Sequence, residues 1–84
     1  MVPAVVDGRA MERLKWKSRR GLLELDIVFE RFWSGAGAVM SEGEAAALER
    51  LLLLPDNDLL DLVMGRAEIP EASLRTVLDK LRAS

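Results

Sequence analysis

Apolar residues recur every three or four positions along most of this 84-residue chain, a spacing that places them on one face of an α-helix. Runs of β-branched residues, which favour strands, are almost absent. Proline, glycine and short polar residues fall between the apolar stretches, where helices would begin or end. The pattern therefore predicts an all-α fold of about five short helices.

The first helix is expected to run from residue 7 or 8 to about residue 19, and the second from about residue 21 to residue 33. On the first helix, Met11, Leu14 and Ser18 share one face. The second helix offers a larger apolar set for burial: Leu22, Leu23, Leu25, Ile27, Val28, Phe29 and Phe32. The small residues of "SGAG" (34–37) predict a loop after it.

A third helix should begin at Ser41, because Ser41 and Glu44 have the spacing of a capping box. It should end near residue 53, since Pro55 lacks an amide hydrogen and restricts the residue before it. Asp56 is expected to be the N-cap of a short fourth helix that closes at Gly65.

Pro70 and Glu71 are expected to open the fifth helix. The predicted core residues of the last three helices are Leu48, Leu51, Leu52, Leu59, Leu60, Leu62, Val63, Leu74, Val77, Leu78 and Leu81. The connections are short, so consecutive helices should pack against each other. A chain of this length is too short for two cores, and we expect one compact domain over residues 1–84, with residues 1–6 as a flexible N-terminal tail.

Composition narrows the chemistry that this domain can support. Cysteine and histidine are both absent, which removes disulfides, thiol nucleophiles, the usual zinc ligands and the usual general base. No nucleophile motif or glycine-rich phosphate motif is present, so we expect a protein that is not an enzyme. Asp56 and Asp58 are better explained as charges that favour a helix N-terminus than as a catalytic pair.

The longest apolar run, residues 51–54, is far too short to cross a bilayer, so no membrane insertion is expected. The N-terminal apolar patch has no basic region ahead of it, which makes it a poor secretory signal. Together these features favour a cytoplasmic protein.

Charge is distributed unevenly along the chain. Residues 1–20 hold six basic and two acidic residues, whereas the rest holds six basic and twelve acidic ones. Arg13, Lys17 and Arg20 lie at helical spacing and could line a phosphate-contacting face, although a solvated surface face is the simpler interpretation. The two tryptophans, Trp16 and Trp33, are interpreted as core-edge residues, with anchoring of a partner as the alternative for Trp16.

The segment "KWKSRRGLLELD" (15–26) places a glycine and a charge reversal inside an apparent helix. Arg20 and Glu24 would be neighbours at i, i+4 if they shared that helix, and could form an ion pair. Gly21 has two explanations of equal weight. It lets one helix stop and the next start at an angle, or its missing side chain lets a partner's backbone come close.

The wider segment "RLKWKSRRGLLELD" (13–26) resembles the signature of the small bacterial and mitochondrial flavinylation factors that assist assembly of succinate dehydrogenase. The Arg-Gly-x-x-Glu hallmark of that family matches Arg20, Gly21 and Glu24, and its flanks match Trp16, Arg19, Leu25 and Asp26. "LLLLPDNDLLDLVMGRAEIP" (51–70) resembles a downstream segment of the family, although Asn57, Leu60 and Leu62 depart from its pattern.

The resemblance implies a five-helix assembly factor that binds the flavoprotein subunit of succinate dehydrogenase, and often that of fumarate reductase. Such a factor promotes covalent attachment of FAD to a histidine of that subunit and is not expected to bind FAD tightly itself. By the same resemblance, Arg20, Gly21 and Glu24 form the contact surface, with Arg19 and Trp16 in support and Asp26 beside it.

The alternative is a small helical adaptor or antitoxin-like regulator. It would engage a protein or nucleic-acid partner through the basic face of the first helix, with Arg9, Arg13 and Lys17. The acidic isoelectric point and the lack of an obvious recognition helix count against nucleic acid as the partner.

Overall fold

The structure is a computed structural model that describes residues 8–35, 37 and 40–84. The expected tail at residues 1–6 lies outside the described residues, as does residue 36 of the expected "SGAG" loop. The described elements are five helices: α1 (Gly8–Ser18), α2 (Leu23–Ser34), α3 (Glu42–Leu52), α4 (Asp56–Val63) and α5 (Ala72–Arg82). The predicted all-α fold is therefore confirmed, with each helix within two residues of its expected ends.

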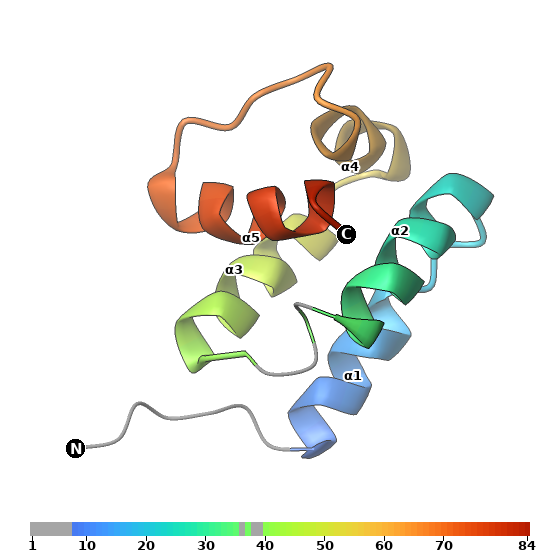
Figure 1. Cartoon of the computed structure of the whole chain (residues 1–84), viewed down its shortest axis with the longest axis vertical. Helices are drawn as coiled ribbons and strands as arrows, with labels where there is room; N and C mark the ends of the chain where they lie inside the picture. The colour runs from blue at the N-terminus through green and yellow to red at the C-terminus, as the bar shows by residue number, and fades with distance from the viewer. Residues whose placement is uncertain (1–7, 36, 38–39) are drawn as a thin grey trace.

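The α1–α2 pair lies beside a second group that consists of α3, α4 and α5 (Figure 1). α1 and α2 lie side by side and run in opposite directions, joined by a short loop. α3 packs most extensively on α5, and α5 also contacts α2 and α4. The α1–α2 pair therefore packs against the second half of the chain through α2 on α5 and α1 on α3.

One apolar cluster fills the space between the helices, and helical spacing on each helix supplies it. Its largest fully buried members are Phe29, Phe32, Leu25, Met40, Leu48, Leu51, Leu59, Leu78, Leu81 and Val77. The predicted core stripes of α3 and α5 are confirmed. On α2, however, Leu23 and Ile27 are exposed, although both were expected to be available for burial.

The ends of three helices show how local chemistry sets the boundaries. The capping box at Ser41 is confirmed, since Ser41 and Glu44 each accept a hydrogen bond from the other's backbone amide. α4 closes at Gly65, which has a φ of 78° and forms a Schellman turn with the residues before it. The prediction of Asp56 as the N-cap of α4 is wrong. Pro55 occupies that position, and the Asp56 carboxylate is used elsewhere.

Glu44 also joins α3 to α5, because its carboxylate forms an ion pair with Lys80. The hydrogen bond from Lys80 is the main cause that lowers the pKa of Glu44 below its ordinary value of 4.5, and the Ser41 backbone amide lowers it further. The carboxylate form is therefore favoured in the folded state.

This coupling predicts how stability depends on pH. A carboxyl group with a lowered pKa stabilises the fold above its unfolded pKa, and that stabilisation is lost as pH falls from about 4.5 through the folded value. Glu44→Gln should keep the capping box, because glutamine can accept the Ser41 amide bond, but it removes the ion pair with Lys80. We expect the variant to be less stable at pH 7 and to lose less stability between pH 5 and pH 3. Urea unfolding at several pH values measures this, and an unchanged pH slope would contradict it.

Among the residues that the structure describes, no helix has the length and apolarity needed to cross a membrane.

Candidate functional site

A four-residue loop, residues 19–22, joins α1 to α2 and contains the arginine and glycine of the motif. Gly21 has a φ of 75°, a conformation that costs other residues free energy, and the chain reverses direction there. The helix-junction interpretation of Gly21 is thus confirmed. Since Arg20 precedes α2 and Glu24 lies within it, the two do not share a helix, and no ion pair joins them among the described residues.

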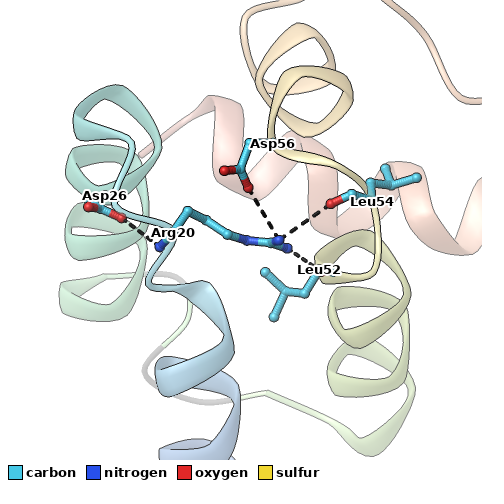
Figure 2. Close-up of polar contacts among 5 residues, drawn as sticks. All are labelled: Arg20, Asp26, Leu52, Leu54 and Asp56. Carbon is cyan, nitrogen blue, oxygen red and sulfur yellow. Dashed lines mark hydrogen bonds and ion pairs between the residues drawn. The ribbon is translucent and has the colours of Figure 1, made fainter.

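The side chain of Arg20 points into the molecule and crosses from the loop to the end of α3 (Figure 2). Its Nη1 lies 3.4 Å from both the Leu54 carbonyl oxygen and the Asp56 carboxylate, and its Nη2 donates to the Leu52 carbonyl oxygen. Only 16% of the side chain is exposed. The backbone amide of Arg20 donates to the Asp26 carboxylate at 3.1 Å, so both ends of the residue are tied down.

The C-terminal end of α3 explains why a guanidinium group lies there. The last carbonyl groups of a helix lack partners within the helix and carry partial negative charge. The Leu53 and Leu54 amides satisfy the carbonyls of Arg50 and Leu51, and Arg20 donates to the carbonyl of Leu52. Arg82 uses the same chemistry at the end of α4, where it donates to the Leu62 carbonyl.

The Trp16 side chain faces solvent, with 70% of its surface exposed, so its interpretation as a core-edge residue is wrong. Leu14 and Ser18 occupy the buried face of α1. Trp16 lies two positions from each of them and therefore on the opposite face of the helix. The Arg19 guanidinium carbon lies 5.4 Å from the Trp16 ring centroid, which is cation–π geometry. The two side chains form an exposed pair beside the loop.

Glu24 lies in the first turn of α2, where the helix dipole favours a carboxylate. Its side chain is exposed and makes no hydrogen bond or ion pair within the described part of the chain. The neighbouring Leu23 is also 70% exposed. We use the term docking surface for the exposed residues Trp16, Arg19, Gly21, Leu23 and Glu24.

The predicted contact residues thus fall into two groups. Four of them (Trp16, Arg19, Gly21 and Glu24) face solvent, whereas Arg20 and Asp26 lie partly buried beneath the loop and bond to each other. Sequence reasoning missed Leu23, because its position in an apolar run favoured burial. It also missed the bond between Arg20 and Asp56, which lie 36 residues apart.

An open groove of about 800 Å³ extends from Gly21 between α1 and α2. Its lining includes Lys15, Arg19, Gly21, Asp26, Glu30 and Trp33. The core-edge interpretation of Trp33 is confirmed. Its ring is half-buried, its Nε1 donates to the Ser18 Oγ at 3.1 Å, and the Lys15 Nζ lies 5.8 Å from its ring centroid. The groove therefore combines an aromatic wall with charges of both signs.

The predicted basic face of α1 does not form as a continuous stripe. Arg20 turns inward, and the Lys17 Nζ lies 2.9 Å from the Glu49 carboxylate on α3. The hydrogen bond from Lys17 lowers the pKa of Glu49, and the charge of Arg13 contributes to the shift. Two of the three cations of that face, Lys17 and Arg20, are thus engaged within the protein, and of these two only Lys17 belongs to the set that the adaptor alternative uses.

Within the described ranges, no group of three or more acidic side chains is placed to hold a metal ion.

Comparison with known proteins places the motif in context. Residues 12–84 match the model of a family, Sdh5, described as the flavinator of succinate dehydrogenase. A protein of Ralstonia nicotianae named FAD assembly factor SdhE is 46% identical, over 92% of this chain and 85% of that protein. Proteins of the same name from Legionella pneumophila and Coxiella burnetii are 36% and 32% identical, over 92% and 87% of this chain and 96% and 89% of their own lengths. No solved structure gives a significant match.

Proposed function

Because this chain belongs to the family of succinate dehydrogenase flavinators, we propose that it is a non-enzymatic assembly factor that binds the flavoprotein subunit and promotes its covalent attachment of FAD. The observation that carries the proposal is the solvent-facing motif loop. Its glycine is held at positive φ, and the carboxylate of the motif glutamate is unpaired within the described residues. An exposed carboxylate that makes no hydrogen bond or ion pair within the described residues is available to another protein.

The docking surface offers two kinds of contact. Trp16 and Leu23 provide apolar area, and aromatic side chains are enriched among the residues that dominate binding energy. Arg19 and Glu24 provide one charge of each sign and fix the orientation of the partner through charge-assisted hydrogen bonds. At Gly21, no atom lies within 4 Å of the position that a side chain would occupy, so a partner's backbone has room to approach.

The proposed mechanism requires no reacting group on this chain. The flavin and the acceptor histidine both belong to the flavoprotein subunit, and that subunit has to hold them in line. A protein that binds only the aligned conformer shifts the partner's population towards it. Holding reactive groups in place can lower a barrier by several kcal/mol, which is sufficient for large acceleration of a slow self-catalysed step.

Co-expression tests the proposal in cells. In a bacterial strain that lacks its own factor, this chain should restore covalent flavin on the flavoprotein subunit, seen as fluorescence after denaturing electrophoresis. Glu24→Ala should reduce that fluorescence about tenfold, the effect of losing roughly 1.4 kcal/mol of binding when this chain is present below its dissociation constant for the subunit.

Glu42→Ala is the matched control, because Glu42 is also an exposed acid in the first turn of its helix. It should leave the fluorescence unchanged. No restoration by the wild-type chain would refute the proposed function. Equal effects of the two substitutions would show that Glu24 does not belong to the docking surface.

A further inference from the structure

We infer that Arg20 is a positioning residue, which holds the motif loop in its binding conformation instead of contacting the partner. The inference rests on the proposed function and concerns which motif residues contact the partner and which hold the loop in shape. Arg20 and Asp26 set the shape of the loop from beneath, while Gly21 and Glu24 meet the flavoprotein subunit. The α3–α4 turn, far away in the sequence, thereby supports the docking surface (Figure 2).

The loop has few other fixed points. Outside Arg20, its backbone is tied by the Arg19 amide, which donates to the Trp16 carbonyl oxygen, and by the Leu22 carbonyl, which accepts the first hydrogen bond of α2. Leu22 is the N-cap of α2 but makes no side-chain capping bond. The bond between the Arg20 amide and the Asp26 carboxylate instead ties the loop to the first turn of α2. Gly21, which has the greatest backbone freedom, lies between these points.

The side chain of Arg20 adds an anchor that only a guanidinium can make in full. Its two terminal nitrogens reach two carbonyl oxygens and one carboxylate at the same time. Lysine has a single ammonium group and cannot reproduce that fork. The Arg20 Nε is buried and has no hydrogen-bond partner among the residues that the structure describes, which is unfavourable, and the contacts of the terminal nitrogens offset this cost. These contacts also leave the guanidinium little capacity for a partner.

A loosened loop would weaken binding without loss of any contact. If the binding conformation is populated only in part, the apparent dissociation constant rises by the inverse of that fraction. Arg20 therefore affects affinity by raising the fraction of free protein that holds the binding conformation. Its partner Asp56 should raise that fraction as well. A residue that touched the flavoprotein subunit directly would instead act independently of Asp56.

A double-mutant cycle separates these cases. We would measure the dissociation constant for the purified flavoprotein subunit with Arg20→Ala, Asp56→Ala and the double variant. In the free proteins, we would measure hydrogen exchange at the backbone amide of residue 20. Arg20→Ala should weaken binding about tenfold and speed that exchange, and Asp56→Ala should do both to a smaller extent. The double variant should bind no more weakly than Arg20→Ala alone.

Asp58→Ala is the matched control, because Asp58 also lies in the first turn of α4 but makes no contact with Arg20. It should change neither measurement. Arg20→Lys replaces Arg20→Ala if the alanine variant fails to fold, with the same expected directions.

Weaker binding with unchanged exchange at residue 20, or full additivity of the two substitutions, would overturn the inference. Failure of the wild-type chain to bind the subunit would refute the proposed function instead. The exchange measurement needs no partner, so it would still report whether Arg20 orders the loop.

Discussion

Gly21→Arg is expected to weaken binding to the flavoprotein subunit by more than 30-fold, a loss of more than about 2 kcal/mol. The substitution has two separate costs, the first on folding stability and the second on binding. Any side chain at position 21 is strained, because its φ is 75°, and this lowers the free energy of unfolding by about 1–2 kcal/mol. An arginine side chain would in addition occupy the open space in front of the loop, where we propose that the partner's backbone lies.

Gly65 supplies a control for the first cost. It has a φ of 78°, and no atom lies within 4 Å of the position that its side chain would take, as at Gly21. It follows α4, however, at the opposite end of that helix from the Asp56 contact with Arg20. Gly65→Arg should therefore destabilise the protein about as much as Gly21→Arg and leave binding unchanged. Calorimetric titration and urea unfolding of both variants measure the two costs. Equal binding by both would contradict the docking surface.

Phe32→Ala is expected to lower the free energy of unfolding by about 3–5 kcal/mol, the largest effect on stability that we predict. The ring is fully buried on α2 and meets the Trp33 ring edge-on, with 5.1 Å between centroids. It also covers Gly37 so closely that a side chain at position 37 would overlap it. Because close-packed interiors relax only partly around a truncated side chain, a cavity would remain.

A domain of this size is stable by only about 4–12 kcal/mol, so Phe32→Ala should remove about a quarter or more of that stability. Leu53→Ala provides the comparison, because Leu53 is 80% exposed and its removal should change stability by less than about 0.5 kcal/mol. Urea unfolding of the two variants measures the difference. A loss below about 1.5 kcal/mol for Phe32→Ala would show that α2 is not packed as described.

The helices could be predicted from the sequence because their signals are local. Apolar spacing located the buried stripes of α3 and α5, and the Ser41 capping box and Gly65 each mark an end within a few residues. The same periodicity predicts that Trp16 is exposed, because Trp16 lies two positions from the buried Leu14. Its charged surroundings and large apolar ring suggested a core edge instead.

The candidate site was less accessible to sequence reasoning, because its geometry depends on distant segments. From the sequence, Arg20 could belong to a basic face of the first helix, or pair with Glu24 if the two shared a helix, and both of these relationships are local. Its actual acceptors lie 32 to 36 residues away, at the end of α3 and the start of α4. Neither periodicity nor motif spacing contains that information. The motif itself falls on the loop between α1 and α2, and the structure adds which of its side chains face inward.

The central claim is that this chain accelerates covalent flavin attachment by direct docking, and a time course with purified components tests it most directly. Flavoprotein subunit without flavin would be mixed with FAD and increasing amounts of this protein, and covalent flavin would be followed by fluorescence after denaturation. We predict a rate that rises with the amount of added protein and saturates once the subunit is fully bound. A rate that is the same with and without this protein would contradict the account.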